Sequence, residues 1–255
     1  LRNIETQLQR IDQIAENQRL EQIAENQRLD QMAENQRLEQ MAEDQRLEQI
    51  VENQRLDQIA ENQRLEQIAR SKFQDFQKGY DAAQAGDNVT AMRLLRPLAE
   101  QGVAQAQFWL GLAYDDDDKG VPQDDVEAVK WYRLAADQGN ARAQSNLGKL
   151  YYMGEGVPKN IKEALRWFRL AADQREVNAQ LNIGIIYDIG IGVPEDNFEA
   201  EMWYALAADQ GNAQAQYNLA QIILNTGGPE NLAEVYSWWN LAAAQGYAEA
   251  INKKK

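Results

Sequence analysis

The chain has 255 residues, and its acidic residues outnumber its basic residues by 14. It contains no cysteine and no histidine, which excludes disulfides, thiolate zinc sites and cysteine nucleophiles and removes the commonest general base and metal ligand. The acidic balance disfavours nucleic acid as a partner, because the only basic run is Lys253, Lys254 and Lys255. We expect no cofactor, no metal and no transmembrane segment, while chemistry by carboxylates alone stays open.

From residue 11 to residue 69 the chain repeats a nonapeptide, [IL]-[ED]-Q-[IM]-[AV]-E-[ND]-Q-R, with minor variation. Leucine, glutamine, glutamate, arginine and alanine all favour helix. The first glycine is Gly79 and the first proline is Pro97, so nothing interrupts this stretch. We predict a first domain, residues 1–72, formed by one unbroken helix, of which 70 residues span roughly 105 Å.

The nine-residue period places the apolar residues of this helix on two opposite sides. Nine residues advance a helix by roughly 900°, half a turn beyond two full turns. Leu20 and Ile23 therefore face one way, and Leu29 and Met32 face the other way. We expect self-association through both sides, by Leu20, Ile23, Leu29, Met32, Leu38, Met41, Leu47, Ile50, Leu56, Ile59, Leu65 and Ile68.

This pattern differs from the single seam of a heptad coiled coil, whose spacing only Leu1, Ile4, Leu8 and Ile11 follow. A helix with two stripes can contact two neighbours, which favours a bundle of several helices or an open array without choosing between them. The alternative is a solvated, glutamine-rich rod with weak self-association. We disfavour it because a lone helix gains little from isolated Leu–Ile pairs in water.

After residue 72 a second repeat begins, marked by Trp131, Trp167, Trp203 and Trp238 at spacings of 36, 36 and 35 residues. Each unit predicts two helices. The first carries A-x-A-Q-x-x-L-G-x-x-Y, as in residues 141–151, and a G-x-G-V-P loop ends it. The second carries E-A-x-x-W-[YF]-x-L-A-A, as in residues 163–172.

A helix pair of this size cannot bury its apolar face alone, so the pairs must stack into a continuous core with large residues against small ones. Residues 73–85 and 89–99 form a divergent first pair, and residues 247–252 begin a final half unit. Glycine ends three of the second helices, but Arg175 takes that position in the fourth. We expect this corner to differ or to be strained.

These motifs, in this order and at this period, resemble the Sel1-like repeats, relatives of the tetratricopeptide repeats, over residues 73–252. The resemblance implies a right-handed superhelix of antiparallel helix pairs and an adaptor or scaffold role without catalytic residues. Many members of the family carry cysteines that join the helix pairs, and this chain has none. The predicted fold is therefore all-α, with a long N-terminal helix followed by an α-solenoid over residues 73–255.

Positions at which the repeats differ from one another are candidates for an exposed binding face. Two such columns lie on the first helix of each unit, away from its regularly apolar side. They consist of Phe108, Ser145, Leu181 and Tyr217, and of Leu112, Lys149, Ile185 and Gln221. Apolar residues on an exposed face often mark a binding surface, and the alternative is that adjacent layers cover them as core.

Two polar features have simpler interpretations. Asn146, Asn182 and Asn218 recur at one position, where they either grip a peptide backbone or make hydrogen bonds within the solenoid, and we slightly favour the second. The run from Asp115 to Asp118, followed by Lys119, lacks the alternating ligand spacing of a calcium loop, which favours a solvated acidic loop.

The favoured function is a non-enzymatic scaffold that binds other proteins or peptides and is multimerised by its N-terminal helix. The second hypothesis is a structural subunit, in which the long helices build a fibre or tube that the solenoids decorate or lock. An enzyme is the third, and no catalytic constellation supports it.

Overall fold

A computed structural model describes the backbone of residues 2–116 and 121–253, and the side chains of residues 13–116 and 121–252. Outside this description lie Leu1 and the side chains of Ile4, Leu8 and Ile11 from the predicted heptad start. Residues 117–119 of the acidic run, the side chain of Lys253, and Lys254 and Lys255 lie outside it as well. The described residues contain helices and no strand, which confirms the all-α prediction. Two compact units, residues 1–70 and 71–255, are described separately below.

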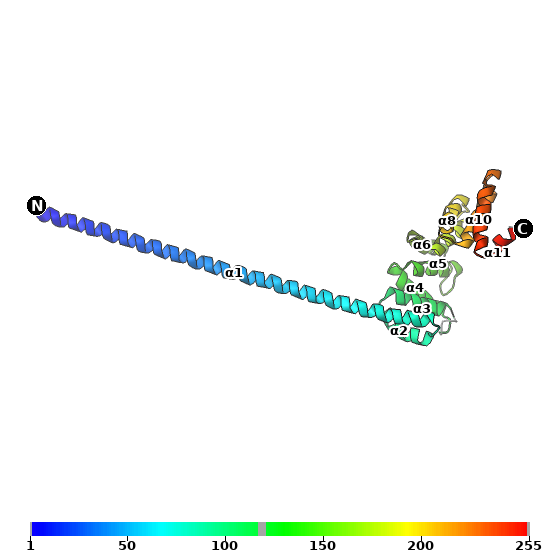
Figure 1. Ribbon diagram of the computed structural model, residues 1–255, viewed down its shortest axis with the longest axis horizontal. Helices are drawn as coiled ribbons and strands as arrows, with labels where there is room; N and C mark the ends of the chain where they lie inside the picture. The colour runs from blue at the N-terminus through cyan, green and yellow to red at the C-terminus, as the bar shows by residue number, and fades with distance from the viewer. Residues whose placement is uncertain (1, 117–120, 254–255) are drawn as a thin grey trace. The chain divides into compact units, whose positions relative to one another are not determined.

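The first unit consists of the greater part of a single helix, α1 (Arg2–Gln84). The helix runs without a break, as Figure 1 shows, because its sequence contains neither proline nor glycine before Gly79. Every described side chain from residue 13 to residue 70 is exposed. The final turns of α1 belong to the second unit, so no helix end separates the nonapeptide repeats from the first helix of the solenoid.

The second unit stacks antiparallel helix pairs (Figure 1). After the end of α1 its elements are α2 (Asn88–Glu100), α3 (Ala104–Asp115), α4 (Asp125–Asp137), α5 (Ala141–Met153), α6 (Ile161–Asp173), α7 (Val177–Ile189), α8 (Asn197–Asp209), α9 (Ala213–Thr226), the 3-10 turn η2 (Pro229–Asn231), α10 (Leu232–Ala244) and α11 (Ala248–Lys253). We call α3, α5, α7 and α9 the A helices and α4, α6, α8 and α10 the B helices. Their bounds agree with the two helices predicted for each repeat.

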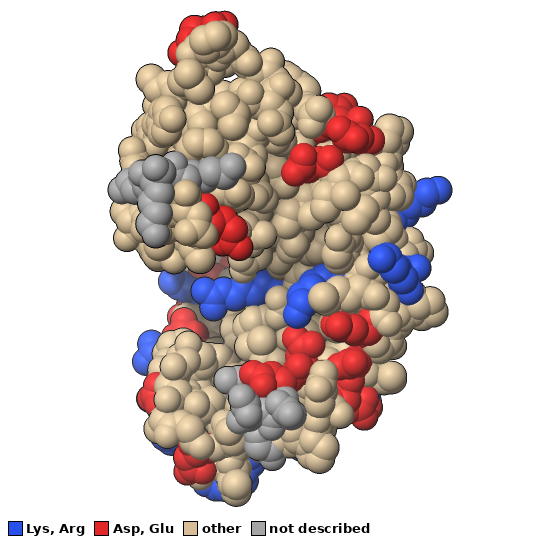
Figure 2. All heavy atoms as spheres, turned by 90° about the vertical axis from the view of Figure 1, so that its right-hand side faces the viewer, with Lys and Arg blue, Asp and Glu red and all other residues tan. Residues whose placement is uncertain are grey.

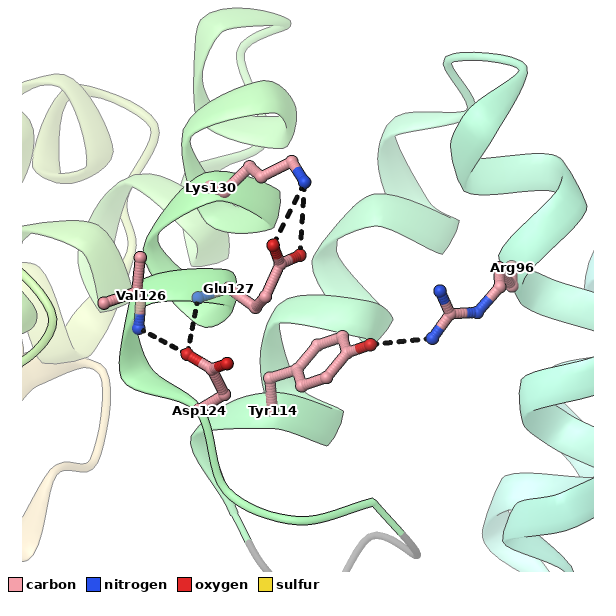
Figure 3. Close-up of polar contacts among 6 residues, drawn as sticks. All are labelled: Arg96, Tyr114, Asp124, Val126, Glu127 and Lys130. Atoms are coloured by element: carbon pink, nitrogen blue, oxygen red, sulfur yellow. Dashed lines mark hydrogen bonds and ion pairs between the residues drawn. The ribbon is translucent and has the colours of Figure 1, made fainter.

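Local chemistry explains where these helices begin and end. At the start of α4, the side chain of Asp124 accepts hydrogen bonds from the backbone N–H groups of Val126 and Glu127, both at 3.1 Å (Figure 3). Such a cap satisfies donors that have no partner within the helix. At the other end of the A helix α5, Gly154 takes a left-handed conformation with φ 85°, which an L side chain rarely adopts.

Aromatic residues of the B helices form the core between and within the pairs. Trp131 of α4 joins an apolar cluster formed by α2 and α3, and Trp167 of α6 joins one formed by α4 and α5, so each connects its own helix pair with the preceding one. The following residue, such as Phe168, packs against a glycine of its own A helix. A Cβ atom on Gly148 would lie only 2.8 Å from two ring carbons of Phe168. Gly111 faces Tyr132, and Gly184 faces Tyr204, in the same way.

The corner at Arg175 is strained, as predicted. Arg175 has φ 65°, and no other non-glycine residue among those described has a positive φ. Its backbone N–H still donates to the carbonyl of Ala172 at 2.8 Å, as Gly139 donates to Ala136 at 2.9 Å in the preceding repeat. The solenoid therefore imposes the glycine conformation on an arginine, because the hydrogen bonds of the corner require it.

Candidate interaction surface

The A helices present one face, which we call the A-helix face, built from the two variable columns that the sequence singled out. The columns occupy equivalent positions of α3, α5, α7 and α9, and contacts between α3 and α5 and between α5 and α7 bring the helices side by side. Lys149 is exposed, whereas Phe108, Leu112, Ile185, Tyr217 and Gln221 are half-buried and Ser145 and Leu181 are buried.

Of the two interpretations left open for the eight positions, the exposed face is wrong at two of them. Ser145 is 3% exposed and Leu181 is 7% exposed. Leu181 belongs to a core cluster with Tyr204 of α8 and Leu219 of α9, so its own B helix and the following helices cover it. For these two residues the alternative interpretation as core holds, because each layer buries part of the surface of the one before it.

The half-buried members of the A-helix face combine a core contact with an open surface. Phe108 and Leu112 pack against the core cluster formed mainly by α4 and α5, and the ring centroids of Phe108 and Tyr132 lie 6.0 Å apart. Ile185 and Tyr217 pack against the last core cluster in the same way. The core thus holds these side chains in place while part of each remains accessible.

A hollow of about 610 Å³ lies at the N-terminal end of this face. Its walls include Phe108 and Leu112 of α3, Phe76 and Tyr80 from the end of α1, and Arg142 at the start of α5. The rings of Phe76 and Tyr80 stack at a centroid distance of 6.0 Å. Gln84, Gln105 and Asn140 also line it, so the hollow combines apolar and polar walls, as ligand-binding sites do.

Sequence reasoning found Phe108 and Leu112 among the wall residues and missed others, including Phe76, Tyr80 and Arg142. Phe76 and Tyr80 stand four residues apart in the divergent first pair, a spacing that places them on one face of the helix. This spacing was the available signal. Arg142 carried a weaker one, because it stands where other repeats have Gln105, Asn178 and Gln214.

Two cations distinguish α5 from the other A helices. Arg142 and Lys149 are exposed and lie seven residues apart, which places them on the same side of the helix. Among the described residues neither forms an ion pair. By contrast, Lys130 Nζ on α4 lies 3.1 Å from Glu127 Oε1, and Arg96 on α2 donates to the Tyr114 hydroxyl on α3 at 2.7 Å (Figure 3).

The wider surface of the solenoid is mixed in charge. Figure 2 shows groups of acidic side chains with lysine and arginine side chains gathered between them across the middle of the view. Two cations of the B helices are paired within their own helix, Lys130 with Glu127 and Arg166 with Glu163, both at 3.1 Å.

A buried polar network fixes the edge of the A-helix face. The Tyr132 hydroxyl donates to Asp115 Oδ2 at 3.1 Å and accepts from Asn146 Nδ2 at 2.9 Å. Burial, followed by the nearby charge of Asp115, raises the pKa of Tyr132 above its usual value, and Tyr204 beside Asp188 behaves in the same way. Both hydroxyls therefore remain neutral donors at physiological pH.

This network accounts for two of the three recurring asparagines. Asn146 bonds to Tyr132, and Asn218 bonds to Tyr204 in the equivalent arrangement. Phe168 stands at the third equivalent position and offers no hydroxyl to Asn182. The interpretation as hydrogen bonding within the solenoid therefore holds at Asn146 and Asn218.

Sequence reasoning also missed a ladder of buried glutamines that joins the layers. Gln144 is 5% exposed, and its Nε2 atom donates to the carbonyl of Ala136 at 3.1 Å. Its Oε1 atom accepts from Gln174 of the next corner at 2.8 Å. The same Gln–Gln bond recurs at Gln107–Gln138, Gln180–Gln210 and Gln216–Gln245. The available signal in the sequence was the glutamine that recurs in every repeat, in A-x-A-Q of the first helix and in A-A-x-Q at the end of the second.

Neither a metal-binding cluster nor a membrane-spanning helix is found in the described residues. No group of three or more acidic side chains among them is placed to hold a metal ion. Within the same ranges, no helix combines the length and apolar character required to cross a membrane.

Stacked helix pairs, an interlayer core and an apolar face held by that core define an α-solenoid of the interaction-module class. The Sel1 repeat matches residues 104–140, 141–175, 177–212 and 213–247, and the chain belongs to this family. Sel1 repeat proteins generally mediate protein–protein interactions, and their fold is a non-catalytic scaffold.

Solved structures support the assignment. The chain is 36% identical to c5321, a protective antigen of uropathogenic Escherichia coli with an SLR fold, with a TM-score of 0.65 over 74% of this chain and 42% of that one. It therefore spans less than half of that antigen. It is also 36% identical to a Sel1 repeat protein from Oxalobacter formigenes, with a TM-score of 0.64 over 70% of this chain and 73% of that one.

A third structure shares the fold alone. A Sel1 repeat protein from Klebsiella pneumoniae is 18% identical, with a TM-score of 0.50 over 71% of this chain and 90% of that one. No match was found among curated proteins.

Proposed function

We propose that the solenoid binds segments of other proteins along the A-helix face, and that the N-terminal helix multiplies this site by self-association. The observation that carries the proposal is the hollow bounded by Phe76, Tyr80, Phe108, Leu112 and Arg142. Aromatic side chains in a preformed hollow provide large contact area at low entropic cost.

The chemistry of the face suggests the composition of the bound segment. On α3 the face offers Phe108 and Leu112, and on the adjacent α5 it offers the unpaired cations Arg142 and Lys149. Adjacent packed helices are about 8–10 Å apart, a distance that an extended chain covers in about three residues. A segment with apolar and acidic residues about three positions apart fits this arrangement.

Selection from a displayed random peptide library tests the proposal with the full-length protein. We expect the selected peptides to lose at least tenfold in affinity when Phe108 and Leu112 are both replaced by serine. The matched control is Val126→Ser on α4, which removes a 65% exposed apolar side chain from a B helix. Equal losses in both variants, or unaltered binding after the double substitution, would refute the proposed face.

Charge reversal provides a second test that does not disturb the core. Arg142→Glu and Lys149→Glu change exposed side chains, and surface substitutions of this kind usually leave stability within about 0.5 kcal/mol. We expect them to weaken binding of acidic peptides and to reduce its dependence on salt. Circular dichroism and thermal melting establish that each variant remains folded.

The proposed self-association is supported by the exposure of both stripes of α1. The Leu20 side chain is 56% exposed and Leu29 on the opposite side is 58% exposed. Burying each fully would contribute roughly 1.5–3 kcal/mol relative to leaving it in water. Mass in solution, compared with and without residues 1–70, tests the proposal. A full-length chain that is monomeric at micromolar concentration would defeat it, as would a truncated chain that assembles equally well.

A structural role is the alternative, supported by the same two exposed stripes. In that case the long helices would polymerise into a fibre or tube, and the solenoids would decorate or lock it. Negative-stain images of the full-length protein separate the two functions, because a scaffold gives discrete particles and a structural subunit gives filaments.

A further inference from the structure

The part of α1 from residue 13 to residue 70, which we call the rod, carries two equivalent apolar surfaces. Side one consists of Leu20, Ile23, Leu38, Met41, Leu56 and Ile59. Side two consists of Leu29, Met32, Leu47, Ile50, Leu65 and Ile68, with Ile14 at its start. The twelve paired residues are all between 42% and 59% exposed, so neither side is more covered than the other.

The period of these surfaces equals the period of a straight α-helix. Each side repeats every 18 residues, which is five turns at about 3.6 residues per turn. A heptad repeat drifts around the helix and imposes a left-handed supercoil, and an 11-residue repeat imposes a right-handed one. The rod's repeat drifts in neither direction, so a straight partner can follow one side along its whole length.

The spacing also identifies the partner. Apolar pairs on one side recur every 18 residues, or about 27 Å. A binding helix must offer its own apolar pairs at this interval over the full rod. A second copy of this rod meets the requirement. Side two of the rod repeats side one after a shift of nine residues, or about 13.5 Å along the axis, and a rotation of half a turn about it.

We propose, on the basis of the self-association proposed above, that each rod binds two further copies of itself, one on each side, in a straight layer one helix thick. The contact surfaces lie about 180° apart, whereas a closed bundle of three or four helices needs them about 60° or 90° apart. The neighbours align in whole steps of nine residues, because other offsets place apolar pairs against glutamine and glutamate.

The arginines of the rod fit such a layer. Arginines such as Arg55 stand roughly a quarter turn from the nearest leucine, near the two flanks that the layer exposes to water. They form long, exposed pairs within the helix, Arg55 with Glu52 at 3.7 Å and Arg64 with Glu61 at 3.9 Å. Both faces of the layer therefore carry arginines in contact with water. The glutamates that pair with them lie on the contact sides, in the intervals between the apolar pairs.

Two full-length variants test this arrangement. The side-one variant replaces the six side-one residues with glutamine, and the side-two variant replaces the six side-two residues and Ile14. Glutamine already occurs throughout the rod and has a helix propensity close to that of leucine and methionine, so circular dichroism should show the helix retained. A third variant with both sets replaced is the control without either surface.

Sedimentation equilibrium and native mass spectrometry at matched concentration give the number of copies. We expect three or more copies for the unaltered chain, two for each one-sided variant and one for the doubly replaced variant. A mixture of the side-one variant, labelled with nitrogen-15, and the side-two variant should give mixed pairs, because their remaining surfaces match after a nine-residue offset.

The outcomes separate this inference from the proposed self-association. A monomeric unaltered chain would show that self-association itself is wrong. An unaltered chain that assembles only to two copies, or a one-sided variant that keeps the mass of the unaltered chain or becomes monomeric, would overturn the two-sided layer while self-association stands. The absence of mixed pairs would overturn the equivalence of the two sides.

Discussion

Substituting Gly148 with alanine tests whether the glycines of the A helices are needed for the approach of an aromatic side chain. The new Cβ atom would lie 2.8 Å from two ring carbons of Phe168 and 3.1 Å from a third. Ordinary carbon contacts are about 3.5–4.0 Å, so the ring would have to retreat by about 0.7 Å. Phe168 is 1% exposed and has no open space to enter.

Two opposing effects set the magnitude. Overpacking a core costs about 1–3 kcal/mol, whereas replacing glycine by alanine inside a helix favours folding by about 1 kcal/mol. We therefore expect Gly148→Ala to lower the free energy of unfolding by about 1 kcal/mol. Tryptophan fluorescence during urea unfolding measures this change in the second unit, because the chain's six tryptophans all lie within it.

The matched control uses a smaller side chain at the contact. In a Phe168→Leu background the ring is absent, and we expect the same glycine substitution to cost at least 1 kcal/mol less or to become stabilising. Equal effects in the two backgrounds, or a gain of stability in the unaltered chain, would show that the close approach does not explain the glycine.

Arg175→Gly should raise the free energy of unfolding by about 0.5–1 kcal/mol, because glycine adopts a positive φ without strain, and Gly139→Arg should act in the opposite direction in the same urea assay. Gln144→Ala should cost about 1–3 kcal/mol by leaving its buried partners unsatisfied, which thermal unfolding can verify. Burial and neighbouring aspartates raise the pKa of Tyr132 and Tyr204. The free energy of unfolding should therefore be unchanged below pH 10 and fall above it. Absorbance at 295 nm should show both hydroxyls protonated until the protein unfolds.

The composition of the candidate site shows where reasoning from sequence reaches its limit. Comparison among repeats separated the positions that vary from those that recur. It could not tell that Leu181 is covered while Ile185 is only half-buried. That difference depends on which side chains the next helix pair places over each position. Phe76 and Tyr80 enter the hollow from the end of α1, which is distant in sequence from α3 and α5.

The amino-acid sequence by itself determined the helical fold, the length of the repeats, the strained corner at Arg175 and the opposite placement of the two rod stripes, because each follows from periodicity and local backbone preference. Tertiary structure decided which variable residues remain accessible, how Arg142 comes to lie beside Phe108 and how buried glutamines link successive layers. These features depend on contacts between residues about 30 or more positions apart in the chain, which local patterns do not encode.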